Sequence, residues 1–365
     1  MNTTQLMNRA ADNIRILAAA MVEKAKSGHP GGAMGGADFI NVLYSEFLEY
    51  DPENPEWEAR DRFFLDPGHM APMLYAQLCM AGKYSMADLQ TLRQWGSVTP
   101  GHPERDLQHG IENTSGPLGQ GHTFAVGAAI AAKWMNARFG AIHNPTIYTF
   151  ISDGGVQEEI SQGAGRMAGF LGLDNLIMFY DSNEVQLSTD CREVTAENVA
   201  AKYEAWGWFV QEIQGNDPDA IREALTRAKA EQQRPSLIIG HTTMGKGCVT
   251  ADGANFEGKC STHGQPLSKS GASFEATVKH LGGDPENPFA IFPEVQEMYD
   301  ARAAQLRELA NQRYEQYYEW KQANPLAANE YETFMSGEVP CIDWSEIVQK
   351  QGAATRNASA TVLGY

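Results

Sequence analysis

The sequence has few cysteines, little positive charge and no long apolar run. The five cysteines form no C-x-x-C pair, and their number is odd; they are Cys79, Cys191, Cys248, Cys260 and Cys341. This pattern excludes a disulfide framework and a zinc ribbon, and it predicts a reducing, cytoplasmic location. Residues 1–13 lack a basic region followed by an apolar run, and the most apolar stretch, 124–132, is far shorter than a bilayer. We therefore expect neither a secretory signal nor a membrane segment.

Positive charge is scarce: 28 Lys and Arg stand against 46 Asp and Glu, a net charge of −18. Such a field repels nucleic acids and anionic membranes, so we expect neither as a partner. It also repels sugar phosphates, so a bound phosphate would need local positive groups or a cation. With 365 residues, 42% of them hydrophobic, the chain can form one large globular domain or two ordinary ones.

Apolar residues at helical spacing predict a first helix that begins after Thr3 or Thr4 and ends at Ser27-Gly28, where Gly28 would supply the left-handed turn. Glycine-rich segments follow, read as loops: SGHPGGAMGG, DPGHM, TPGHPE and TSGPLGQGH. After the last of these, an Ala-rich segment to about residue 134 predicts another helix.

From residue 146 the pattern alternates between strand and helix. Strands are predicted at 146–151, 175–181, 208–213 and 236–240, with helices at 157–171, 197–206 and 217–232. This order predicts an α/β fold with three α/β/α layers and a mostly parallel sheet. A long solvated helix is expected at 294–324, an irregular segment at 325–345, and a new amphipathic segment from Ile347.

Polar residues follow the first two predicted strands. Asp153 comes directly after one strand and Asn183 after the next, 30 residues later, which is about the length of one strand–helix–strand unit. A carboxylate and an amide oxygen at one sheet edge suit Mg²⁺ or Ca²⁺. Gly154 and Gly155 allow close approach of a diphosphate to the helix N-terminus. The alternative is that Asp153 caps a helix and Asn183 lies in a turn.

Histidines are concentrated beside glycines. Seven of the nine adjoin one: His29, His69, His102, His109, His122, His241 and His263. This exceeds what 35 glycines in 365 residues would give by chance. Each histidine alone is more often structural, but histidines in tight glycine loops as a group are typical of a functional site.

Two nucleotide-binding motifs are excluded. Gly163 to Ala168 fits G-x-G-x-x-A with Asp181 beyond it, but it begins twelve residues after the predicted strand, inside a helix, so close helix packing is the better interpretation. The sequence contains no G-x-x-x-x-G-K-[ST] motif.

These motifs resemble the transketolases, which use thiamine diphosphate. SGHPGG, RDRFFLDPGHM, GHPE, TSGPLGQG, SDGGVQEE, the YDSN turn and STHGQPL match successive signatures of that family's N-terminal half, in order, over residues 8–365. The resemblance implies the thiamine diphosphate-binding fold over residues 1–324, a linker at 325–345, and the start of a pyrimidine-binding domain at 346–365.

The resemblance also implies roles for single residues. Asp153, Asn183 and the Val185 carbonyl match the ligands of the metal, Mg²⁺ or Ca²⁺. The residues that contact the cofactor in the family correspond to His69, Gly116, Leu118, Gly154, Asn183 and His263. Substrate contacts match His29, His102, His263 and Arg356. Glu158 matches a carboxylate near the dimer interface, in a relay between cofactor sites. The sequence departs from the family pattern at Ser152 and Glu159, where glycine is usual.

The implied activity is transfer of a two-carbon ketol unit from xylulose 5-phosphate to ribose 5-phosphate or erythrose 4-phosphate, in the pentose phosphate pathway. Thiamine diphosphate supplies the carbanion, and we assign the proton transfers to His29 and His263. The acid that activates this cofactor lies in a second domain in the family, and this chain ends at ATVLGY. We therefore predict no transfer by the chain alone, and a homodimer or a complementary C-terminal chain as partner.

Two other interpretations remain open. Dihydroxyacetone synthase and deoxyxylulose phosphate synthase share parts of this pattern, although GHPE and STHGQPL fit the latter less well. The second interpretation is a non-catalytic module that binds thiamine diphosphate without transferring a ketol unit.

Overall fold

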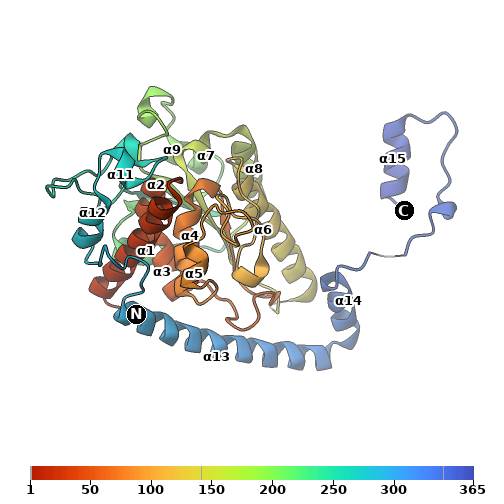
Figure 1. Ribbon diagram of the computed structural model, residues 1–365. Coiled ribbons are helices and arrows are strands. Elements are labelled where there is room, and N and C mark those ends of the chain that lie inside the picture. Colours follow the sequence, from red (N-terminus) through yellow and green to blue (C-terminus); the bar gives the residue numbers. More distant parts are fainter. Residues whose placement is uncertain (1, 141, 340) are drawn as a thin grey trace. The chain divides into compact units, whose positions relative to one another are not determined.

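The computed structural model describes residues 2–140, 142–339 and 341–365 (Figure 1). Two compact units divide the chain: the first extends to Tyr317, and the second is Tyr318–Tyr365. The domain boundaries expected from the sequence, at 324 and 345, stay predictions. Within the described residues, we find no helix with the length and apolar character needed to cross a bilayer.

The first unit is built on a sheet of five parallel strands in the order β1-β2-β3-β5-β4. They are β1 (Arg62–Leu65), β2 (Ile147–Ser152), β3 (Leu176–Ser182), β5 (Ser236–His241) and β4 (Phe209–Gln214). Four of these strands were predicted. Strand β1 was missed because it has only four residues, too few for a periodic signal.

Helices cover both faces of the sheet, which confirms the predicted α/β/α layers. One face packs on α1 (Thr4–Ala25), α3 (Ala37–Val42), α4 (Ala71–Met80) and α10 (Pro218–Ala230), with Phe39 stacked on Phe179 at 4.0 Å between ring centroids. The other face packs on α6 (Gln120–Phe139), α8 (Glu159–Leu171) and α9 (Val199–Ala205), around the buried Trp208.

The first helix is shorter than predicted. Thr3 caps α1 as expected, but the helix ends at Ala25, where Lys26 takes the left-handed helical conformation with φ 55°; Gly28, two residues later, also has a positive φ, of 141°. The next segment, read as a loop, contains the helix α2 (Pro30–Gly35). Proline suits the first position of a helix, and the glycines allow close packing: a Cβ added at Gly31 would lie 2.5 Å from the sulfur of Met244.

The helix predicted at 157–171 is confirmed as α8, which begins at Glu159. A short helix that was not predicted, α7 (Asp153–Gln157), precedes it, and the two are separated at Glu158, whose backbone is extended. Ser152 caps α7, and its Oγ accepts a hydrogen bond of 3.4 Å from the N–H of Gly155. Within α8, a Cβ at Gly165 would contact the rings of Trp206 and Tyr203. This confirms that the G-x-G-x-x-A segment serves helix packing.

The remaining helices are α5 (Met86–Leu89), α11 (Leu267–Ser270), α12 (Phe274–His280), α13 (Pro293–Ala323), α14 (Pro325–Met335) and α15 (Thr355–Leu363). Helix α13 confirms the long helix predicted at 294–324. The prediction of an irregular segment at 325–345 is wrong for the first eleven residues, which form α14. Proline at its first position starts this helix, and Lys321 pairs with Glu332.

Candidate functional site

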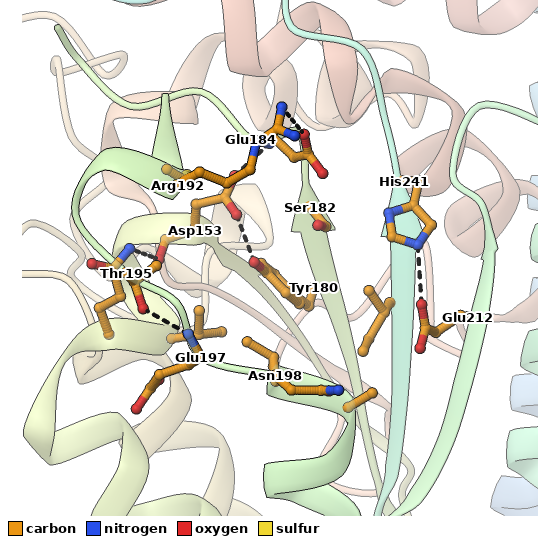
Figure 2. A pocket seen from close by; sticks show the side chains of 16 residues that line it. Asp153, Tyr180, Ser182, Glu184, Arg192, Thr195, Glu197, Asn198, Glu212 and His241 are labelled. Carbon is orange, nitrogen blue, oxygen red and sulfur yellow. Dashed lines mark hydrogen bonds and ion pairs between the residues drawn. The ribbon is translucent and has the colours of Figure 1, made fainter. Parts of the chain in front are cut away.

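Asp153 lies at the first residue of α7, directly after β2, and is 4% exposed. Its Oδ2 accepts hydrogen bonds from the backbone N–H groups of Asn183 (3.2 Å) and Glu184 (3.1 Å). Its Oδ1 accepts one of 2.5 Å from the hydroxyl of Tyr180, and Figure 2 shows these two side chains pointing toward one another. The ends of β2 and β3 therefore meet as the sequence predicted, because Ser152 pairs with Asp181 in the sheet.

The side chain of Asn183 holds the turn after β3. Its Oδ1 accepts a hydrogen bond of 3.0 Å from the N–H of Val185, and its Nδ2 donates one of 3.0 Å to Asp181. Asp181 is fully buried and also accepts a hydrogen bond from the hydroxyl of Thr242. No role at the cation site was predicted for Asp181, which was considered only with the excluded G-x-G-x-x-A motif and the YDSN signature, although its place at the end of a strand, beside Asn183, was visible.

Two buried carboxylates thus lie under one turn. Burial raises the pKa of Asp153 to about 6 and that of Asp181 to about 7, and their hydrogen bonds offset this only in part. In the described part of the chain, no Lys or Arg forms an ion pair with either. A cation bound here would therefore stabilise the ionised carboxylate.

The oxygen donors at this turn fit a hard divalent cation. Asp153 offers a carboxylate, Asn183 an amide oxygen and Val185 a backbone carbonyl, the ligand types of Mg²⁺ and Ca²⁺. The described residues include no cluster of three or more His, Cys, Asp or Glu suited to a metal. A cation here would therefore need the amide, the carbonyl and oxygens from its ligand to complete its coordination.

A pocket of about 230 Å³, lined in part by Asp153, lies between residues of β3, β4 and β5 and the segment 184–200 (Figure 2). Polar side chains on its wall pair with each other. Arg192 contacts Glu184 at 3.1 Å, and His241 Nε2 lies 3.2 Å from a carboxylate oxygen of Glu212. Because these side chains already have partners, the pocket is a weak candidate for a charged ligand.

Three histidines from separate segments form one cluster. Ring centroids are 5.0 Å apart for His29 and His69, 5.4 Å for His69 and His263, and 5.7 Å for His29 and His263. His102 lies beside them, since a Cβ added at Gly68 would be 3.0 Å from its ring. The structure therefore brings together the four histidines that the resemblance assigned to the cofactor and the substrate.

The cluster is uncharged near neutral pH. Burial lowers the pKa of His29 to about 4, assisted by repulsion from the His263 ring when that ring is protonated. Burial also lowers the pKa of His69, His102 and His263. The Nδ1 atoms of His29 and His263 are buried without a hydrogen-bond partner in the described structure. Such atoms fit a site that is completed by another molecule.

Leu187 links the turn after Asn183 to the histidines. A Cβ added at Gly264 would lie 3.0 Å from Leu187 Cδ1 and 3.5 Å from His29 Nε2. Leu187 is 67% exposed, although it is apolar. The sequence analysis missed it; its only signal was an apolar residue inside a polar turn. The oxygen donors and the histidines therefore border one continuous site.

The segment with Gly116 and Leu118 lies against the start of α7. A Cβ added at Gly154 would be 2.8 Å from Leu118 Cδ1, while one added at Gly116 would meet no atom within 4 Å in the described structure. The cofactor contacts assigned to these three residues stay predictions.

Asp66, which the sequence analysis missed, holds this segment in place. It is fully buried, and its carboxylate accepts hydrogen bonds from the N–H groups of Gly119 (3.0 Å) and His122 (3.2 Å). Its carbonyl accepts one of 2.8 Å from the hydroxyl of Ser115. Burial raises its pKa to about 6. The available signal was an acid directly after the unrecognised strand β1.

Glu158 and Arg356 are the two predicted residues outside this arrangement. Glu158 is exposed on the single chain, between α7 and α8, beside Gly119 and Ile160. Arg356 lies on α15, in the second compact unit. Their predicted roles in a relay and in substrate binding stay predictions.

Comparisons with known proteins identify the family of the chain. Residues 6–340 match the family model of the transketolase thiamine diphosphate-binding domain. The chain is 38% identical to transketolase 2 of Escherichia coli over 369 residues, covering 97% of this chain and 54% of that protein. It is 37% identical to a transketolase of Halalkalibacterium halodurans, over 97% and 53% of the two chains. The chain thus spans about half the length of these relatives.

Solved structures of transketolases also superpose on this chain. A transketolase from Leishmania mexicana superposes with a TM-score of 0.91 at 34% identity, over 100% of this chain and 54% of that one. A transketolase from Pichia stipitis in complex with sedoheptulose 7-phosphate gives 0.89 at 32% identity, over 99% and 54%.

Proposed function

Since the chain belongs to the transketolase family and matches its thiamine diphosphate-binding domain, we propose that it supplies the diphosphate-binding half of a ketol transferase. The observation that supports this most is the junction of two groups of residues. The oxygen donors around Asp153 and the four uncharged histidines border one site. Leu187, in the turn after Asn183, lies between the two groups.

The oxygen donors would hold the diphosphate through a divalent cation, Mg²⁺ or Ca²⁺. Asp153, Asn183 and the Val185 carbonyl are the ligands in this proposal, and Gly154 leaves room for the diphosphate. The chain has a net charge of −18 and therefore repels a diphosphate. The cation reduces this repulsion, because it neutralises the charge of the diphosphate locally.

The histidines would bind and deprotonate the sugar. Bound thiamine diphosphate supplies the nucleophilic carbanion for cleavage next to a ketose carbonyl. His29 and His263 are uncharged near neutral pH, so each can accept a proton from a sugar hydroxyl and return it. His69 would contact the diphosphate, and His102 and Arg356 would position the substrate.

The substrates in this proposal are xylulose 5-phosphate as donor and ribose 5-phosphate or erythrose 4-phosphate as acceptor, which places the reaction in the pentose phosphate pathway. Dihydroxyacetone synthase or deoxyxylulose phosphate synthase activity, or cofactor binding without transfer, are the alternatives. All five cysteines are free thiols, in agreement with the cytoplasmic location that we propose.

The proposal requires a second polypeptide segment and a second copy. The chain spans about half of its relatives, so we propose that the remaining half, in the same or another chain, is needed for transfer. An apolar surface on α6 and α8 suits a homodimer. It consists of Phe124, Trp134, Ile160, Met167, Phe170 and Leu171, with exposed fractions of 46–88%. Glu158 adjoins this surface through Ile160.

Two measurements test the function. Titration of the chain with thiamine diphosphate should show binding that depends on Mg²⁺ or Ca²⁺ and is lost in EDTA. Mixing with the C-terminal half of a transketolase should then give transfer from xylulose 5-phosphate to ribose 5-phosphate. Binding without transfer would favour the non-catalytic module, and transfer only to formaldehyde or from pyruvate would favour the two other synthases. Binding independent of a cation would contradict the proposed site.

A further inference from the structure

Arg93 occupies a strained backbone position near the histidines. It follows α5, and its φ is +63°; the other non-glycine residues with positive φ in the described chain are Lys26 and Glu184. A hydrogen bond of 3.0 Å from its N–H to the carbonyl of Thr99 holds this conformation. A long side chain in the left-handed region costs about 1 kcal/mol or more, so the position of the side chain requires an explanation.

The guanidinium of Arg93 touches two loops of the site. Its Nη1 donates a hydrogen bond of 2.7 Å to Oγ of Ser27, two residues before His29. On the other side it covers Gly101, the residue before His102: a Cβ added at Gly101 would lie 2.7 Å from Nε of Arg93. One side chain therefore lies between the loops that carry His29 and His102.

The positive charge of Arg93 also acts on the cluster. It contributes to the lowered pKa of His29, His69 and His102. The groups facing His29 are His69, His102, His263 and Arg93, so this guanidinium is the one permanent charge among them. Burial alone shifts the pKa of Arg93, downward, and the described residues include no carboxylate that forms an ion pair with it.

We propose that Arg93 is a positioning residue of the site, whose guanidinium joins the His29 loop to the His102 loop and keeps a fixed positive charge beside both imidazoles. The charge adds to burial in disfavouring protonation of these rings, which therefore stay able to accept protons from a sugar. It also attracts a substrate phosphate toward a chain that is otherwise strongly acidic. The catalytic part of this role rests on the proposed ketol transfer, whereas the effect on the histidines does not.

Histidine titration of the full chain tests the proposal without turnover. Signals of ¹³C-labelled imidazoles are followed from pH 3.5 to 8 in the parent chain, Arg93→Gln and Arg93→Lys, and assigned with His29→Gln, His69→Gln and His102→Gln. Arg93→Gln should raise the midpoints of His29, His69 and His102, while Arg93→Lys, which keeps the charge, should leave them near the parent values. Arg105→Gln, in the same surface cavity as Arg93, is the matched control.

A second variant covers the case in which Arg93→Gln does not fold. Gly101→Ala keeps the arginine but inserts a methyl group at 2.7 Å from its Nε, so it should displace the guanidinium and raise the midpoint of His102. Unchanged midpoints in a folded Arg93→Gln chain would overturn the proposal, as would equal shifts in Arg105→Gln. A failure of ketol transfer would leave the titration result intact, so the two proposals can fail separately.

Discussion

The Oδ2 atom of Asp153 accepts a hydrogen bond of 3.2 Å from the backbone N–H of Asn183, thirty residues further along the chain. This bond connects the ends of two neighbouring strands and places a buried carboxylate under the turn that offers the amide of Asn183 and the carbonyl of Val185. The arrangement leads to the first of four predictions.

Asp153→Ala should weaken cation-dependent binding of thiamine diphosphate about 100-fold, because it removes the charged ligand of the cation. Calorimetric titration with Mg²⁺ present and absent measures the change. Asp252→Ala, which alters an exposed acid outside the proposed ligand set, is the matched control and should bind as the parent does. Parent-like affinity in a folded Asp153→Ala chain would contradict the metal site.

Gly154→Ala should weaken cofactor binding about tenfold, because the new methyl group lies 2.8 Å from Leu118 Cδ1 and pushes that side chain toward the cofactor. Leu118→Ala removes the contact, so the double variant should bind better than Gly154→Ala alone. Gly127→Ala, where an added Cβ meets no described atom within 4 Å, serves as control. The idea fails if the effects of the two substitutions simply add.

His122 should make the chain sensitive to mild acid. Its side chain is fully buried, and burial lowers its pKa to about 4, from an ordinary value near 6.5. Between these values the unfolded chain binds the proton and the folded chain does not, so stability falls as the pH decreases below about 6.5. From pH 7.5 to 5.5 this costs about 1 kcal/mol.

Urea unfolding of the parent and His122→Leu at both pH values measures this contribution. The parent should lose about 1 kcal/mol more than the variant over this range. His280→Leu, on α12, should lose as much as the parent. Equal losses in the parent and in His122→Leu would show that His122 is not the group responsible.

Phe170→Lys should favour the monomer. Phe170 is 88% exposed on α8, at the apolar surface that we propose for the homodimer, and a charge there would be buried without a partner. Sedimentation of the chain with cofactor and cation should show at least a tenfold weaker dimer. Leu326→Lys, at an equally exposed leucine on α14, is the control, and a dimer unaffected by Phe170→Lys would place the interface elsewhere.

The sequence determined the layers of the fold and the position of the oxygen donors. Apolar runs near 147 and 176 predicted neighbouring parallel strands, and parallel strands end at one edge, so Asp153 and Asn183 had to meet. This inference needs only local periodicity and the handedness of one connection. The prediction of single elements failed where the local signal was weak, as for the four residues of β1, or misleading, as for the glycine-rich α2.

Only the tertiary structure decided how the histidines meet and what surrounds them. His29, His102 and His263 are separated by more than 70 residues each, and no periodic pattern encodes that distance; the family resemblance suggested their roles but not their spacing. The parts played by Arg93, Asp66 and Leu187 depend on side chains packed between loops. Such contacts follow from the packing of the whole core, because each loop is positioned by the helices and strands at its two ends.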